Sequence, residues 1–245
     1  VVAFRRRYQD YFAANNKKSS VKKIKLDDSP RVILVPGVGL FGVGNDAKAA
    51  HVAADLAETT IKVTAAAEAV GQFESISKYD QFEIEYWSLE QAKLIKGEEK
   101  PLARHVAIVT GAGGTIGRAI AGAFRASGAD VALLDRDAKA VEAAAADVGG
   151  MAIVADVTDT KSVYDAYDRV IEAFGGIDIL VSNAGAAWQG RMDQVDERVL
   201  RESFELNFFA HQNLAQRAVQ IMQKQSTGGV LLFNLLFAST QRNCS

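Results

Sequence analysis

The chain has 245 residues, a formal net charge of -2, and 49% hydrophobic and 24% charged residues, which is ordinary for a globular protein. This balance gives no reason to expect a nucleic-acid or membrane partner, and no apolar run is long enough to cross a bilayer. The single cysteine, Cys244, excludes an internal disulfide, and the histidines, His51, His105 and His211, lack metal-ligand spacing. No leader segment is recognisable, so we expect a cytoplasmic protein without a bound metal.

The two ends of the sequence predict that the chain is a piece of a longer protein. It begins with Val1 rather than methionine, and the apolar run Leu235–Phe237 is followed by a polar stretch. We expect residues 237–245 to form an irregular tail.

Residues 1–31 are rich in arginine and lysine, and two interpretations are open. The first is the solvated face of a helix followed by a polar loop. The second is an arm that contacts phosphate or nucleic acid, for which only Tyr8, Tyr11 and Phe12 supply aromatic rings. Because no known binding motif accompanies these residues, we favour the first interpretation and expect no nucleic-acid partner.

The first glycine-rich segment follows Arg31–Val35, a predicted buried strand. Residues 37–42 match the G-x-G-x-x-G pattern of dinucleotide-binding loops. However, the flanking Pro36 and Gly44 suit a hairpin with Leu40–Val43 as the returning strand, and no strand ending in an acidic residue follows about 20 residues later. We therefore predict a hairpin here and not a phosphate site.

A helix and two short elements complete the first part of the chain. Asn45 or Asp46 offers a side-chain oxygen that can cap a helix, which we expect to run to about Val70. A short strand at 82–87 and a short helix at 88–95 should follow. The sequence thus divides into a first domain, a linker and a second domain, at 1–96, 97–101 and 102–236.

The second domain alternates apolar segments with helical ones. Its predicted strands are nearly all apolar, as strands buried on both faces are: His105–Thr110, Asp130–Leu134, Met151–Ala155, Ile177–Ser182 and Gly229–Phe233. Helices are expected between them, at about 115–127, 138–147, 160–174 and 196–224. This alternation predicts an α/β fold with a doubly wound parallel sheet.

The second glycine-rich segment lies between the first of these strands and the first helix. A turn that contains Gly111, Gly113 and Gly114 lets the backbone approach a pyrophosphate closely, and the helix that begins near Ile116 directs its free N–H groups there. Gly117 allows helix and strand to pack closely. The segment predicts a phosphate-binding loop, although glycine turns also occur for steric reasons alone.

The next strand ends in Asp135, 18 residues after Gly117. A carboxylate at this place can accept both ribose hydroxyls of an adenosine and repels a 2′-phosphate, which favours NAD over NADP. The neighbouring Arg136 argues the other way, because arginine pairs with a 2′-phosphate. Asp135 can also be read as a plain helix cap.

The second domain resembles the short-chain dehydrogenase/reductase family, whose dinucleotide-binding fold is the Rossmann sheet. The resemblance rests on the turn Thr110–Gly117, on Asp156-Val157, on Asn183-Ala184-Gly185 and on Asn207. Thr115 replaces the middle glycine of the family pattern, and Ser182 replaces a frequent asparagine. In the family, Asp156 and Val157 lie against the adenine, Asn183, Ala184 and Gly185 support the sheet near the cofactor, and Asn207 is an active-site residue. Read alone, Asn207 can also be a polar helix residue that faces solvent.

The resemblance also shows what is absent from this chain. The family uses a serine, a tyrosine and a lysine four residues after the tyrosine to move the hydroxyl proton. None of the six tyrosines here has a lysine four positions on, and Leu236 and Phe237 stand where the serine is expected. The resemblance therefore implies a Rossmann sheet that is incomplete at its C-terminal edge.

The first domain resembles the end of a class II aldolase domain, on residues 31–44, the following helix and Tyr86–Glu90. The domain order is similar to that of the bifunctional rhamnulose-1-phosphate aldolase/lactaldehyde dehydrogenase group. Class II aldolases hold zinc with histidines, but Val38-Gly39 stands where a His-Gly turn is common. We therefore expect a remnant without aldol chemistry.

Together these features predict the NAD-binding part of an oxidoreductase that transfers a hydride to or from a small hydroxy-aldehyde, alcohol or sugar-derived substrate. The alternative is an inactive dinucleotide-binding fragment, and we expect no dehydrogenase activity from this chain alone. We also expect a homo-oligomer, since an uncovered last strand, Val230–Phe233, would pair with another chain.

Overall fold

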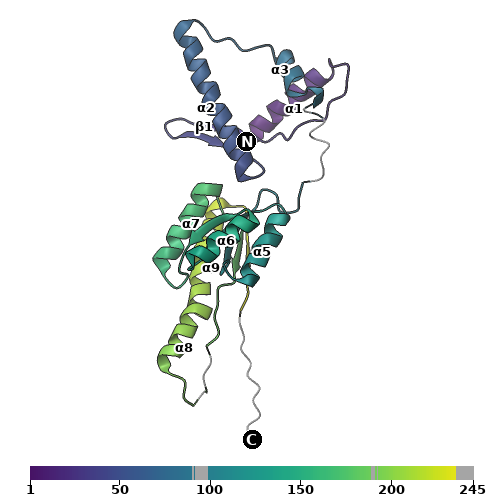
Figure 1. Cartoon of the computed structure of the whole chain (residues 1–245). Coiled ribbons are helices and arrows are strands. Elements are labelled where there is room, and N and C mark those ends of the chain that lie inside the picture. Colours follow the sequence, from purple (N-terminus) through teal and green to yellow (C-terminus); the bar gives the residue numbers. More distant parts are fainter. Residues whose placement is uncertain (90, 92–98, 189–190, 192, 236–245) are drawn as a thin grey trace. The chain divides into compact units, whose positions relative to one another are not determined.

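The computed structural model describes residues 1–89, 91, 99–188, 191 and 193–235, which form two compact units, Val1–Glu99 and Lys100–Ser245 (Figure 1). The boundary falls within the segment where the sequence predicts a linker. The predicted tail at 237–245 lies outside the described residues. No helix in the described part is long and apolar enough to span a membrane.

The first unit consists of helices α1 (Val2–Asn16), α2 (Ala47–Val70) and α3 (Lys78–Glu85) and the two-stranded sheet of β1 (Val32–Val35) and β2 (Gly39–Gly42). The strands pair antiparallel, with Val35 opposite Gly39, so the first glycine-rich segment is a hairpin. Asp46 caps α2 by accepting from the Ala49 N–H at 2.7 Å.

Aromatic side chains join α1 to α3. Phe82 and Tyr86 are fully buried, and the Phe82 ring packs against the rings of Tyr11 and Phe12. The Tyr8 hydroxyl donates to Glu85 Oε1 at 2.5 Å and lies 2.6 Å from the Tyr86 hydroxyl. This cluster forms the core of the first unit.

Two expectations for the first unit were wrong. Residues 82–87 do not form a strand: most of them belong to α3, because Ser77 caps that helix and the four-residue spacing of Phe82 and Tyr86 places both rings against α1. β1 is exposed at all four positions and not buried, since β2 is its only partner strand among the described residues. The helix expected at 88–95 is seen at residues 88, 89 and 91, and the rest of it lies outside the described residues.

The second unit is a five-stranded parallel sheet in the order β5-β4-β3-β6-β7. Its strands are β3 (Val106–Thr110), β4 (Asp130–Asp135), β5 (Met151–Val154), β6 (Ile179–Ser182) and β7 (Val230–Phe233). The helices between them are α5 (Thr115–Ala126), α6 (Ala138–Val148), α7 (Thr160–Phe174), α8 (Glu197–Phe204) and α9 (Ala210–Gln225). This is the doubly wound α/β fold that the alternating pattern predicts.

Helices cover both faces of this sheet. Alternate strand residues such as Ile108 and Leu134 pack with α7 and α9, whereas their neighbours such as Val109 and Leu133 pack with α5 and α6. All five residues of β3 are therefore buried, which explains its unbroken apolar sequence. β7 is an edge strand of the described sheet and is mostly exposed.

The helix predicted at 196–224 is not uniform. α8 passes into a π-helical segment, Glu205–Phe209, which passes into α9. π-helical turns change the direction of the side chains that they carry and recur at functional sites. This one contains Asn207.

Candidate functional site

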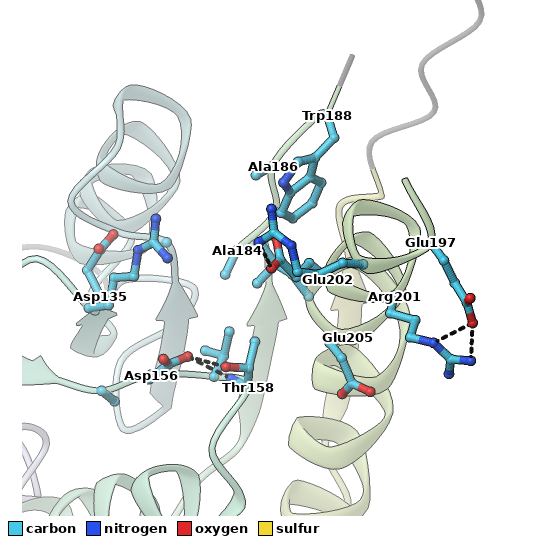
Figure 2. Close-up of a pocket in the computed structure, with 17 residues that line it drawn as sticks. Asp135, Asp156, Thr158, Ala184, Ala186, Trp188, Glu197, Arg201, Glu202 and Glu205 are labelled. Carbon is cyan, nitrogen blue, oxygen red and sulfur yellow. Dashed lines mark hydrogen bonds and ion pairs between the residues drawn. The ribbon is translucent and has the colours of Figure 1, made fainter. Parts of the chain in front are cut away.

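The main cavity of the second unit opens at the carboxyl ends of its strands and has a volume of about 840 Å³. β3 pairs with β4 on one side and with β6 on the other, so the chain reverses its direction of travel across the sheet there. Ligands of open α/β sheets bind at such a point. Figure 2 shows Asp135 and Asp156 on one side of the cavity and the labelled side chains of α8 on the other.

The structure brings half of the predicted site residues into this cavity and leaves the others around it. Those that line the cavity are Gly111, Asp135, Asp156, Val157, Ala184 and Gly185. Those that do not are Gly113, Gly114, Ile116, Gly117, Asn183 and Asn207. Most residues of the second group hold residues of the first group in place by packing or hydrogen bonds.

The glycine turn between β3 and α5 is tightly packed. Gly111 has a φ of +64°, and a Cβ on it would come within 2.9 Å of Ala184 Cα. A Cβ on Gly117 would lie against the Gly111 carbonyl oxygen and 2.8 Å from Ala112 Cα. Gly114 is the N-cap of α5 and makes no side-chain cap bond, so the first turn, with Ile116, presents its N–H groups without a capping acceptor.

Backbone N–H groups hold Asp135 at the end of β4. Gly113 N donates to Asp135 Oδ2 at 3.0 Å, and Asp137 N donates to Asp135 Oδ1 at 3.0 Å. The carboxylate is half-buried and lines the cavity beside the exposed Arg136. A carboxylate has about four acceptor sites, so two remain for a ligand.

Asp156 and Val157 follow β5. The Asp156 carboxylate accepts from the Thr158 hydroxyl at 2.7 Å and from the Thr158 N–H at 2.9 Å. These bonds, with a smaller contribution from the positive charge of Arg136, lower the pKa of Asp156 below its ordinary value. Val157 is buried and forms the apolar floor beside this carboxylate.

Asn183 and Ala184 are tied to the end of β3. The buried Thr110 hydroxyl accepts from Asn183 N at 2.9 Å and from Ala184 N at 3.0 Å, and Asn183 Nδ2 donates to the Thr110 carbonyl at 2.9 Å. Asn234 Nδ2 donates to Asn183 Oδ1 at 2.8 Å. These bonds fix the loop whose residues Ala184 and Gly185 line the cavity.

Asn207 is half-buried and does not face solvent, because its amide is bonded at both ends to one backbone residue. Asn207 Nδ2 donates to the Ala186 carbonyl at 2.8 Å, and Ala186 N donates to Asn207 Oδ1 at 3.1 Å. The residue lines a neighbouring groove that also includes Phe208 and His211. Asn207 therefore holds the wall of the main cavity from behind.

Sequence reasoning missed the charged wall that α8 contributes. Arg201 pairs with Glu197, and Arg198 donates to Glu202 at 2.8 Å, all on the cavity side of this helix. The opposite charges four residues apart were the only sign in the sequence. Trp188 also lines the cavity and had not been singled out.

A buried serine–histidine pair was missed as well. Ser182 Oγ lies 2.6 Å from His211 Nδ1, which joins the end of β6 to the start of α9. Ser182 is fully buried and His211 is 6% exposed, and this burial lowers the pKa of the imidazole. Ser182 and His211 are 29 residues apart, and no short motif links them.

Comparison with known protein families gives a separate assignment to each unit. Residues 105–234 match the model of the short chain dehydrogenase family. Residues 1–94 match the model of the second domain of class II aldolases. The order of the two matches is the one that the sequence predicted.

Three similar proteins illustrate these matches. The chain is 32% identical over 241 residues to the uncharacterized oxidoreductase YuxG of Bacillus subtilis, covering 95% of this chain and 34% of that protein. It is 47% identical over 87 residues to D-threitol dehydrogenase of Mycolicibacterium smegmatis, covering 34% of each protein. The structure of a 3-ketoacyl-(acyl-carrier-protein) reductase from Brucella melitensis in complex with NADH superposes with a TM-score of 0.51 at 27% identity, covering 53% of this chain and 56% of that one. The chain thus spans about a third of the length of the two curated relatives.

Proposed function

Because the chain belongs to the short-chain dehydrogenase family, we propose that its second unit binds NAD for hydride transfer to or from a small hydroxy-aldehyde, alcohol or sugar-derived substrate. The observation that carries the proposal is the Asp135 carboxylate, held at the cavity by two backbone N–H groups beside the glycine turn. The name of the D-threitol dehydrogenase supports a polyol as one such substrate.

The glycine turn fits a dinucleotide. Side chains at Gly111 and Gly117 would collide with the backbone, and their absence lets the turn lie flat at the start of α5. The uncapped N–H groups of α5 suit a pyrophosphate, which accepts hydrogen bonds and is attracted by the helix dipole. Asp156 and Val157 offer a hydrogen-bonding edge and an apolar floor for the adenine.

The choice between NAD and NADP depends in this proposal on Asp135. Its carboxylate accepts ribose hydroxyls and repels a 2′-phosphate, whereas the exposed Arg136 beside it favours a 2′-phosphate. The two backbone bonds fix Asp135 toward the cavity. Arg136 is exposed, so solvent weakens its attraction for a phosphate. We therefore expect NAD to be preferred.

A bound nicotinamide supplies the hydride acceptor or donor. This chain would contribute the binding and orientation of the dinucleotide, through the turn, Asp135 and the loop that Asn207 and Thr110 hold in place. A second candidate function is dinucleotide binding without catalysis. It is favoured by the absence of a lysine four residues after any of the six tyrosines.

Titration calorimetry with NADH and NADPH on the 245-residue chain tests the proposal. We expect tighter binding of NADH, and Asp135→Ala should weaken it by about tenfold while it narrows the difference from NADPH. Asp165→Ala is the matched control, because Asp165 does not line the cavity and, in the described part of the chain, pairs with the exposed Lys161 on α7. Tighter binding of NADPH by the unchanged chain, or binding of neither, overturns the proposal.

We also propose that the protein is a homo-oligomer that pairs through β7. Val230, Leu232 and Phe233 are about half exposed on β7, an edge strand of the sheet that the described residues form, and the outer N–H and C=O groups of such a strand can pair with another chain. Sedimentation velocity should show a dimer or larger species. A stable monomer at high concentration contradicts this expectation.

A further inference from the structure

Gly113 lies between the Asp135 carboxylate and the first turn of α6. A Cβ on Gly113 would come within 2.8 Å of Ala140 Cβ, 3.0 Å of Asp135 Oδ2 and 3.1 Å of Asp135 Cγ. Its φ is not positive, so the backbone there suits any residue. The space between Ala140 and the carboxylate is therefore what requires a glycine.

We propose that Gly113 is a positioning residue that sets the choice between NAD and NADP by letting the turn close on Asp135. This inference rests on the proposed dinucleotide binding. Without a side chain, Gly113 brings its N–H to 3.0 Å from Oδ2 and fixes the face of the carboxylate that meets the ribose. The glycine thus acts through Asp135 and does not itself touch the ribose.

The surroundings of Asp135 determine which group yields when a methyl group is added. Ala140 belongs to the first turn of α6, which is fixed because Ala140 N donates to Asp137 Oδ1 at 3.0 Å. Asp137 N in turn donates to Asp135 Oδ1 at 3.0 Å. Ala140 is therefore fixed, so the new methyl group must move away from it and displace Asp135 Oδ2, the freer neighbour. The bond from Gly113 N is lost.

The consequence for the ligand is a change in selectivity. A displaced carboxylate no longer presents both oxygens to the ribose hydroxyls, so NADH loses a charge-assisted hydrogen bond. NADPH makes no such bond and is repelled less once the carboxylate has moved. Gly113→Ala should lower the affinity for NADH by about tenfold and that for NADPH by less than about twofold.

A matched control stands one residue further along the same turn. A Cβ on Gly114 would meet only the Gly111 carbonyl oxygen, at 3.4 Å, and would not approach Asp135. Whatever Gly114→Ala does to the affinity for each dinucleotide, it should leave the ratio of the two affinities unchanged. A substitution that merely damages the loop would also leave the ratio of the NADH and NADPH affinities unchanged.

The double variant Gly113→Ala/Asp135→Ala isolates the contact. With the carboxylate removed, the methyl group can shift away from Ala140 into the space that Oδ2 leaves, so the double variant should show the affinities of Asp135→Ala alone. The double variant also tests the inference if Gly113→Ala by itself fails to fold, because removal of the carboxylate should then restore folding. A double variant that stays unfolded, or whose selectivity differs from that of Asp135→Ala, overturns the inference.

The test is calorimetric titration of the unchanged chain and the four variants with NADH and NADPH, with circular dichroism to check the fold. The inference is supported if the ratio of NADH affinity to NADPH affinity is smaller in Gly113→Ala and unchanged in Gly114→Ala. Equal losses of both affinities in Gly113→Ala overturn it and leave the proposed function intact. If the unchanged chain binds neither dinucleotide, the proposed function fails first, and the inference fails with it.

Discussion

Two glycine-rich turns in this chain have similar sequences and unlike structures. Gly37–Gly42 matches the dinucleotide-binding pattern fully, yet it joins two antiparallel strands. Gly111–Gly117 departs from the family pattern, yet it joins a parallel strand to a helix at the main cavity. The element that follows a glycine-rich turn therefore decides the role of the turn.

The glycines themselves show the same difference. Gly37 and Gly39 adopt positive φ, and a Cβ on either would meet nothing within 4 Å. They serve the geometry of the hairpin. Side chains on Gly117 and on Gly111, whose φ is also positive, would collide with neighbouring backbone, as would one on Gly42 at the end of β2. The second turn therefore uses its glycines for close approach, which is what a phosphate site requires.

The cores of the two units differ as well. Among the described residues, the first unit buries only Phe82, Tyr86 and Asn15, and α2 buries none of its 24 residues. The second unit buries both faces of its sheet. Because hydrophobic burial is the main source of stability, the first unit should unfold at the lower temperature.

The largest expected effect comes from removing the centre of the smaller core. Phe82→Ala should destabilise the first unit by about 3–5 kcal/mol, because the ring is fully buried among three other aromatic rings. Thermal unfolding followed by circular dichroism should lose its first transition, while NADH affinity is retained. Phe41→Ala, at a ring that is 50% exposed, is the control and should change little. A parallel loss of NADH binding would show that the units depend on each other.

The two turns can be compared directly by adding one methyl group to each. Gly117→Ala should reduce NADH affinity by roughly 100-fold, because the turn must move away from α5. The free N–H groups of α5 then no longer point at the pyrophosphate. Gly42→Ala also forces a methyl group against backbone, at Ala50 and Ala54, but should leave the affinity unchanged. Calorimetric titration of Gly117→Ala and Gly42→Ala with NADH measures the two affinities. Equal effects of the two substitutions would contradict the assignment of the phosphate site to the second turn.

The sequence predicted the second unit well because its physical constraints are local. A strand covered by helices on both faces must be apolar throughout, so all five strands could be recognised in the sequence. Their predicted ends lie within two residues of the observed ends. The hairpin at Pro36 and a cap of α2 at Asn45 or Asp46, which is Asp46 in the structure, also followed from local chemistry. For the same reason the residues of the glycine turn and Asp135 could be singled out.

What was missed depends on contacts between distant segments. Phe82 lies in α3 and Tyr86 at its C-cap because both bury their rings against α1, about 70 residues away in sequence. The π-helical turn at Asn207 accompanies a bond to Ala186, and nothing in the helical pattern marks it. The Ser182–His211 pair joins two elements in the same way. Propensity and periodicity contain no information about such pairings.

A smaller effect is expected where the second turn meets the next strand. Thr110→Val leaves the N–H groups of Asn183 and Ala184 without their acceptor, which should cost about 1–3 kcal/mol in the second unfolding transition. Thr110→Ser keeps the hydroxyl and should restore most of the stability. If serine were as destabilising as valine, the methyl packing that serine loses would matter as much as the hydrogen bonds that valine loses.

The smallest effect concerns the pH dependence of the second unit. Burial lowers the pKa of His211 below the 6.5 of a free imidazole, so the unfolded chain binds a proton that the folded chain does not. Stability should therefore fall as the pH drops below about 6.5, and the loss should level off once the pH passes the folded pKa. His211→Gln removes this contribution, and urea unfolding from pH 8 to pH 5 should show a shallower decline. Ser182→Ala is the control: it removes the hydrogen bond at about 1 kcal/mol but leaves a buried imidazole, so its acid slope should stay. An unchanged slope in His211→Gln would mean that the pKa of His211 is the same in the folded and the unfolded chain, because its burial relaxes when the imidazole is protonated. In that case the end of β6 and the start of α9 would be less tightly joined than the 2.6 Å contact indicates.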